Sequence, residues 1–484
     1  MENHYERTEP DYYTEIYEYY IETDKGQAVI NNIDKYLEQG GSRNIGLTFK
    51  ALIRPAPSEE SFSITVPREK NGRLVDRVEI YSERHFDPSA ETKDLPTLKY
   101  LYIPSGVSSI SIETQALRLP KERINLINFC KVEISPDNPY FCVCENGIYS
   151  KDMTVLHYIF SPEEHFEVPP QVKRIRLGAG RALKGLRRLT VHEGVTEIER
   201  AAFAFCPDLE HADVGAECIG VMAFEKCPSL TSVRLNSKIL CSSAFYNCGS
   251  LNSAELLNTE IIENNVFEGC SSLKKIKLPD TLHSIGSRAF RSTGIARLTI
   301  PYSVKALGGN ICGINTMPEI ISKNGTVSIE ELNGRFARTG TTVSVRSYET
   351  DEIMFKFVML ESGSSVFTKN GIDFTYYDRL FIFDIKIYVL ETMLLAAWTR
   401  FQYPYGADAR TREIFRKYVI NKGSYYLSKL INDETSPSVI ADYSFVELFD
   451  DDVLLSLIDY SANKRKPEIT ALLMQAMNER RNKQ

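Results

Sequence analysis

The sequence lacks an uninterrupted apolar run long enough to cross a membrane. The longest mostly apolar stretch, residues 380–398, contains Asp384, Lys386 and Glu391, whose charges are costly to bury in lipid, so we interpret it as a core helix. A secretory signal is also lacking, because residues 1–7 (MENHYER) have neither a basic start nor a following apolar run of about 7–15 residues. We therefore expect a cytoplasmic protein without a membrane span.

An excess of basic charge is absent as well. The chain has 57 Lys and Arg against 64 Asp and Glu, a formal net charge of −7. A general nucleic-acid binder needs a concentrated basic surface that releases counterions from phosphates, so we expect no nucleic-acid partner. Hydrophobic residues make up 43% and charged residues 25% of the 484 positions, which is typical of a soluble globular chain. At about 150 residues per domain, this length favours two to four structural units.

Motifs for catalysis and metal binding are missing too. None of the seven histidines forms an H-E-x-x-H pair or lies within four residues of a cysteine, and no P-loop, G-x-S-x-G or kinase motif occurs. The ten cysteines are spread through the chain, which argues against a disulfide framework. Cys142 and Cys144 lack a second pair nearby, so we interpret them as structural. We predict no catalytic residue, no cofactor and no metal, and a protein that is not an enzyme.

A repeat of 21–22 residues occupies the middle of the chain. An apolar residue recurs at Leu209, Leu230, Leu251, Leu273 and Ile295. A small-then-aromatic pair keeps step with it: Ala202-Phe203, Ala223-Phe224, Ala244-Phe245, Val266-Phe267 and Ala289-Phe290. A cysteine follows each of the first four phenylalanines by three residues, at Cys206, Cys227, Cys248 and Cys270. One such unit cannot bury its own apolar face, but stacked units share a continuous core.

The pattern within a unit predicts a short strand followed by a turn. Leu273, Ile276 and Leu278 occupy the first, fourth and sixth positions, and the last two point inward from a strand. The alanine-phenylalanine pair then fills the interior from the opposite side. We expect the cysteines to pack in this core as small hydrophobic residues. A metal or redox stack is the alternative, because neighbouring strands would place the thiols about 5 Å apart.

The clearest unit resembles the BspA-type leucine-rich repeat. Residues 273–279 (LKKIKLP), followed by Leu282, Ile285, Ala289 and Phe290, match the family pattern L-x-x-I-x-I-P-x-x-V-x-x-I-x-x-x-A-F. The resemblance covers roughly residues 75–320 and implies a leucine-rich-repeat solenoid. It includes a β-hairpin insert near residues 134–160, in which we place Asn146-Gly147 at the centre of a type I′ turn.

The two ends differ from the repeat. Residues 24–41 carry apolar residues on one side and closing glycines, which predicts a helix, and six tyrosines fall within the first twenty residues. We expect this segment to cover the open end of the solenoid, with a tyrosine-rich binding site as the alternative. After residue 321, short strands are predicted at 341–345, 353–359 and 372–376. Helical periodicity begins near residue 380, with a further helix start at Ser436-Pro437, and this region resembles ankyrin-like carboxy-terminal helices.

The predicted fold class is α+β: a leucine-rich-repeat solenoid with parallel β strands on one face, an N-terminal helical cap and an all-α C-terminal domain. The predicted segments are a cap over 1–74 with a helix and short strands, the solenoid over 75–321, a β-rich connecting segment over 322–379, and a helical domain over 380–484. This organisation predicts a non-enzymatic interaction scaffold or adaptor for a protein partner of unknown identity.

The third and fifth positions of each predicted strand should point outward on the concave face. The candidate protein-binding residues are Arg188, His211, Asp213, Arg234, Glu255, Lys275, Lys277 and Arg297. Among them Arg234, Lys275, Lys277 and Arg297 form a locally basic stretch that suits an acidic protein surface. A merely solvated strand face explains the same residues equally well. For the whole protein, three further hypotheses are a secreted or cell-surface adhesin, a structural homo-oligomer, and an enzyme with a site near residues 320–400.

Overall fold

The structure, a computed structural model, divides into two units, Met1–Leu251 and Asn252–Gln484, and each is described by itself. The described residues are 13–23, 26–30, 46–53, 61–82, 97–113, 131–160, 163–312, 316–322, 331–332, 342–350, 353–358, 367–368, 371–372, 378, 390–403, 407–432 and 448–483.

The first unit begins with two parallel sheets that share a core. Strands β3 (Gly46–Ile53), β7 (Arg77–Ser82) and β9 (Ser109–Glu113) pair in parallel in one sheet, and β4 (Ser61–Thr65), β8 (Thr97–Ile103) and β10 (Val132–Ile134) do so in the other. The short hairpin β5 (Glu69–Lys70) and β6 (Arg73–Leu74) lies between β4 and β7 in the chain. Because the chain alternates between the sheets, three parallel turns are complete before residue 135. Parallel pairing therefore begins at β3, ahead of residue 75, where the sequence places the start of the solenoid.

The predicted amino-terminal helix is wrong where the structure describes it. Gly26–Ile30 forms strand β2, which pairs antiparallel with β1 (Tyr13–Thr23), and β1 in turn pairs antiparallel with β3. Residues 31–41 of the predicted helix lie outside the described residues. The β-branched Val29 and Ile30 and the tyrosines of β1 suit strands, and a partner distant in sequence decided between helix and strand. The described part of the tyrosine-rich stretch, within β1, thus lies along the edge of β3, where it covers that edge.

The predicted hairpin insert is present, with its turn displaced by one residue. Strands β11 (Phe141–Cys144) and β12 (Gly147–Ser150) pair antiparallel, and β13 (Val155–Ile159) follows on the other side of β12. Cys144 pairs with Gly147, so Glu145 and Asn146 are the central turn residues, and Glu145 has a φ of 49°. A Cβ at residue 147 would lie 2.6 Å from the Tyr149 ring, which explains the glycine by close packing instead of by the turn.

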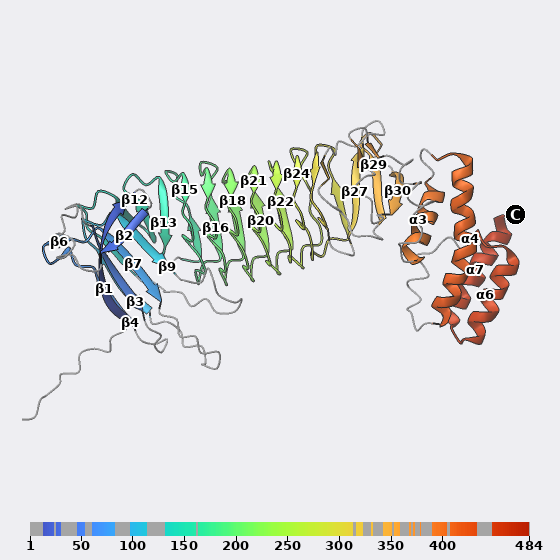
Figure 1. Cartoon of the computed structure of the whole chain (residues 1–484), viewed down its shortest axis with the longest axis horizontal. Coiled ribbons are helices and arrows are strands. Elements are labelled where there is room, and N and C mark those ends of the chain that lie inside the picture. The colour runs from blue at the N-terminus through green and yellow to red at the C-terminus, as the bar shows by residue number, and fades with distance from the viewer. Residues whose placement is uncertain are drawn as a thin grey trace, which may run out of the picture. The chain divides into compact units, whose positions relative to one another are not determined.

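The repeats of the first unit place one strand of each turn in each of two parallel sheets, as Figure 1 shows. One sheet continues from β13 through β15 (Arg174–Ile175), β17 (Glu197–Ile198), β19 (Cys218–Ile219) and β21 (Ile239–Leu240). The other contains β14 (His165–Glu167), β16 (Arg188–Val191), β18 (His211–Val214) and β20 (Ser232–Leu235).

The aromatic residue of each repeat fills the core, as the repeat pattern predicts. Phe203, Phe224 and Phe245 are fully buried and stack, with ring centroids 5.4 Å and 5.1 Å apart. The cysteines are buried as well, and the Cys227 thiol donates a hydrogen bond to the Phe203 carbonyl of the preceding turn at 3.2 Å. Cys206 and Cys248 make the equivalent bonds, to the carbonyls of Gly180 and Phe224. The cysteine position therefore serves both packing and the link between turns.

In the second unit the parallel pairing continues beyond the predicted boundary at residue 321. One sheet contains β23 (Ile261–Ile262), β24 (Ser284–Ile285), β26 (Ala306–Leu307) and β28 (Glu331–Leu332), and another contains β25 (Arg297–Ile300), β27 (Met317–Ser322) and β29 (Thr342–Ser347). The remaining strands are β22 (Ser253–Leu256), β30 (Ile353–Val358), β31 (Phe367–Thr368) and β32 (Gly371–Ile372). Strand β30 is antiparallel to β29. Together the two units hold about seven turns of parallel β-solenoid within residues 155–347.

The carboxy-terminal region is helical, as its periodicity predicts. The described helices are α3 (Leu390–Gln402), α4 (Ala409–Asn432), α6 (Asp451–Asn463) and α7 (Pro467–Lys483). Consecutive described helices contact each other, and α3 also contacts β30. Asp450 caps α6, because its carboxylate accepts from the Val453 amide at 2.9 Å. The predicted helix start at Ser436-Pro437 lies outside the described residues. None of the described helices combines the length and apolar character that a membrane span requires.

Candidate interaction surface

The strand face of the first unit displays polar side chains in the predicted register. Along β16, β18 and β20, outward residues alternate with buried ones, and Arg188, Asp213 and Arg234 are exposed. Parallel pairing aligns Arg188 with His211 in one row, and Asp213 with Arg234 in the other. The sequence therefore located these four candidate residues on one sheet.

Neighbouring turns hold these side chains through polar contacts. The Nδ1 atom of His211 lies 2.7 Å from the Ser232 hydroxyl, and Arg234 Nη1 lies 3.6 Å from an Asp213 carboxylate oxygen. An exposed ion pair of this kind adds only about 0–1 kcal/mol to stability. Its main consequence is orientation, because each side chain is positioned by the turn next to it.

On the second unit, the predicted basic residues differ in their surroundings. Lys275 and Lys277 are exposed, and Lys277 lies opposite the exposed Glu255 in a parallel bridge. Arg297 is exposed too, but its Nε lies 3.5 Å from the carboxylate of Glu319, whose side chain is only 5% exposed. Arg346 approaches the same carboxylate at 3.2 Å. Arg297 therefore compensates the buried charge of Glu319, and it differs in this from the exposed Lys275 and Lys277.

The predicted basic stretch has members in both units. Arg234 belongs to the first unit, whereas Lys275, Lys277 and Arg297 belong to the second. Sequence reasoning missed Glu319 because the last recognisable repeat ends at residue 312. The sequence feature that indicates it is the apolar stretch from Met317 to Ile321, which suits one more strand and contains this single acidic residue.

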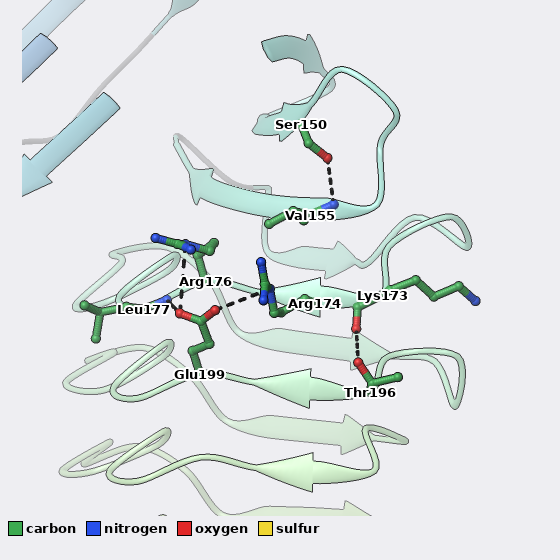
Figure 2. A network of polar contacts seen from close by, with 8 residues as sticks. All are labelled: Ser150, Val155, Lys173, Arg174, Arg176, Leu177, Thr196 and Glu199. Carbon is green, nitrogen blue, oxygen red and sulfur yellow. Dashed lines mark hydrogen bonds and ion pairs between the residues drawn. The ribbon is translucent and has the colours of Figure 1, made fainter. Parts of the chain in front are cut away.

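A second polar cluster, also missed, surrounds Glu199 at the end of β17 (Figure 2). Its carboxylate lies 3.4 Å from Arg174 Nε and 3.9 Å from Arg176 Nε, and it accepts from the Leu177 amide at 3.0 Å. Two guanidinium groups around one carboxylate leave the cluster positive. Nearby His157 has its pKa lowered to about 4, first by burial and then by the charges of Arg176 and Arg174. This histidine is therefore neutral near pH 7.

The remaining candidate chemistry has structural explanations. Burial raises the pKa of Cys142, and its thiol donates to the Ser150 carbonyl at 3.4 Å. Within the described ranges, no group of three or more His, Cys, Asp and Glu residues is arranged to hold a metal. Within residues 320–400, the fully buried Arg400 donates two hydrogen bonds, of 2.8 and 2.9 Å, to the Asp378 carboxylate. This bidentate ion pair stabilises the contact between α3 and Asp378.

Turns whose buried residues lie between two parallel sheets define a solenoid repeat protein. The family model described as "BspA type Leucine rich repeat region" matches six copies, at residues 158–259, 215–316 and 238–336. The chain therefore carries a BspA-type leucine-rich repeat region, as the residue pattern implied.

Several solved structures are similar to the chain. A leucine-rich repeat protein from Eubacterium ventriosum is 17% identical, with a TM-score of 0.34, over 58% of this chain and 96% of that protein. The pneumococcal vaccine antigen PcpA is 15% identical, with a TM-score of 0.28, over 65% of this chain and 98% of that protein. A leucine-rich cell surface protein from Faecalibacterium prausnitzii is 15% identical, with a TM-score of 0.22, over 65% of this chain and 94% of that protein. No curated protein matches the chain.

Proposed function

We propose that the chain is a non-enzymatic scaffold that binds a protein partner through the exposed strand positions of its repeats. The observation that supports this is the alternation along β16, β18 and β20, where polar side chains project in two rows from a buried core. Because the next turn orients several of these side chains, binding would order few of them, which lowers the entropic cost of association. Stacked repeats commonly serve as extended binding surfaces, and this step is an analogy from the fold.

For the partner we propose a protein with an acidic surface, bound in the second unit around Lys275 and Lys277. Both side chains are exposed and lie two residues apart, and Glu255 lies opposite Lys277 in an isolated bridge, because residues 273–279 form no strand longer than that bridge. Charge complementarity would mainly increase the association rate, and it would weaken as the salt concentration rises. A stable interface of about 1,200–2,000 Å² would extend well beyond these two residues.

The test is the double variant Lys275→Glu, Lys277→Glu in the full chain. Arg297 is left unchanged, because its reversal would place a carboxylate beside the buried Glu319 and lower stability for a different reason. We expect capture of an acidic partner from a native lysate to fall at least tenfold, with the thermal unfolding temperature unchanged.

The matched control is Lys305→Glu, Lys422→Glu, which changes the net charge equally at exposed positions away from Lys275 and Lys277. Its capture should equal that of the unaltered chain. Equal capture by both double variants would remove the Lys275 surface from the proposal.

The cytoplasmic location stays a prediction and can be tested separately. Fractionation of the native cells with an antibody against the chain would detect it in the cytoplasm. Detection at the cell surface would favour the adhesin hypothesis instead, and a solution mass of several chains would favour the homo-oligomer.

A further inference from the structure

We propose that Cys218 and Cys241 form a reactive dithiol that a small-molecule disulfide, such as oxidised glutathione, converts to an intramolecular disulfide. Their Sγ atoms lie 3.6 Å apart on adjacent turns, and both residues are half-buried. The pair lies entirely in the first unit, on the sheet that contains β19 and β21. It is therefore a modification site separate from the proposed strand face.

The backbone holds the two cysteines next to each other. Cys218 is the first residue of β19, which pairs in parallel with β21, and Cys241 directly follows β21. The Cys241 amide also donates to the Ile219 carbonyl at 2.9 Å. Ile219 and Leu240 point into the core and are fully buried, so the cysteine side of this turn is the outer one. A disulfide needs an Sγ–Sγ distance of about 2.05 Å, so closure requires the sulfurs to approach by about 1.5 Å.

Four other described cysteines are less suited to this reaction. Cys206, Cys227 and Cys248 are fully buried and donate to backbone carbonyls, so an oxidant reaches them only after unfolding. Cys142 is half-buried and donates to the Ser150 carbonyl, and the raised pKa of its thiol disfavours the nucleophilic thiolate. Cys218 and Cys241 combine partial exposure with an Sγ–Sγ distance of 3.6 Å across adjacent turns.

The reaction proceeds by two thiol–disulfide exchanges. One cysteine, as its thiolate, attacks a sulfur of oxidised glutathione, whose sulfur–sulfur bond breaks and releases one glutathione thiolate. The second cysteine then loses its proton and attacks the protein sulfur of this mixed disulfide, which releases the second glutathione thiolate. Both glutathione thiolates are protonated. The two protein thiols are oxidised, one glutathione disulfide is reduced to two thiols, and adjacent turns become covalently linked.

The experiment exposes the folded full chain to oxidised glutathione and follows its intact mass. We expect a product lighter by two hydrogen atoms, and peptide mapping should join the peptide containing Cys218 to that containing Cys241. Cys218→Ser and Cys241→Ser should each stop at the mixed disulfide, with one glutathione attached, because the resolving thiol is gone. The double variant Cys142→Ser, Cys144→Ser is the matched control and should behave as the unaltered chain does.

Two results would overturn the proposal. One is a persistent mixed disulfide on the unaltered chain, which would show that the two sulfurs cannot close. The other is loss of two hydrogens in Cys218→Ser, which would place the disulfide elsewhere, including at Cys130, outside the described residues. Circular dichroism of each variant before oxidation checks that it is folded, and Cys218→Ala replaces Cys218→Ser if the hydroxyl prevents folding.

Discussion

At the scale of single residues, each repeat uses two left-handed backbone positions, four residues apart, on either side of its aromatic plug. The first position is occupied by Ala201, Met222, Ser243, Asn265 and Arg288, and the second by Phe205, Lys226, Asn247, Gly269 and Ser292. A left-handed conformation costs a residue with a Cβ about 1–2 kcal/mol. The compensation is visible at Lys226, whose amide donates to the Tyr246 carbonyl of the next turn at 2.8 Å. Side chains disfavoured at φ > 0 are therefore tolerated because the turns bond to each other there.

Gly269 tests this cost. It has a φ of 81°, and its amide donates to the Arg291 carbonyl at 2.9 Å. Gly269→Ala should lower the free energy of unfolding by about 1 kcal/mol, since the strain of the added Cβ outweighs the freedom that the unfolded chain loses. The control is Ser292→Ala, at the same position of the next repeat. Because Ser292 already carries a Cβ, this substitution should change the free energy of unfolding little. Equal losses in the two variants in urea unfolding would contradict the strain argument.

His157 gives the chain a pH dependence of known sign. Its folded pKa of about 4 is below the ordinary value of 6.5, so the unfolded chain binds the proton more readily between these values. The stability contributed by neutral His157 is complete above about pH 6.5 and is lost as the pH falls towards 4, by about 2 kcal/mol after allowance for its partial exposure.

The variant His157→Gln should remove this part of the pH dependence. Unfolding free energies measured from pH 7 to pH 4 should fall less steeply than those of the unaltered chain. His283→Gln, at an exposed histidine, is the control and should retain the original slope. If the unfolding free energy of His157→Gln fell with pH as steeply as that of the unaltered chain, burial of this ring would not explain the loss of stability at low pH.

At the scale of elements, the parallel sheets have to protect their edge strands. An edge strand leaves backbone donors and acceptors that another chain can pair with. In the first unit, β1 runs antiparallel along β3, and in the second, β30 runs antiparallel along β29. Helix α3 in turn contacts β30. Thus a strand of opposite direction covers a parallel edge in each unit, and in the second unit a helix packs against that strand.

At the scale of the whole molecule, we expect the repeats of each unit to follow nearest-neighbour energetics, because stacked repeats contact only their neighbours. The same substitution should therefore cost more in a turn with two like neighbours than in a turn with one. Phe224 stacks on both Phe203 and Phe245, whereas Phe290 stacks on Phe267 and pairs with Cys312 through a backbone bridge.

The variants Phe224→Ala and Phe290→Ala compare these two situations. Each should lower the free energy of unfolding by about 3–5 kcal/mol, because both rings are fully buried. Phe224→Ala should cost more by about 0.5–1.5 kcal/mol, the value of one additional aromatic stack. Denaturant unfolding measures both, and a larger loss for Phe290→Ala would contradict nearest-neighbour additivity.

By itself, the sequence determined the coil and the register of its strands. The period from Leu209 to Ile295 and the alternation within each strand are local patterns, and both translate directly into buried and exposed positions. The carboxy-terminal helices follow from local periodicity in the same way, as the burial of Met393, Leu394 and Ala397 confirms.

Only the tertiary structure decided which residues meet across turns and what covers the strand edges. Gly26–Ile30 became a strand because β1 pairs with it, and Arg297 proved to compensate the buried Glu319. The contact between Cys218 and Cys241 likewise depends on how one turn is placed on the next. Local periodicity records whether a side chain points inward or outward, but contacts between residues 20 or more positions apart depend on the stacking geometry.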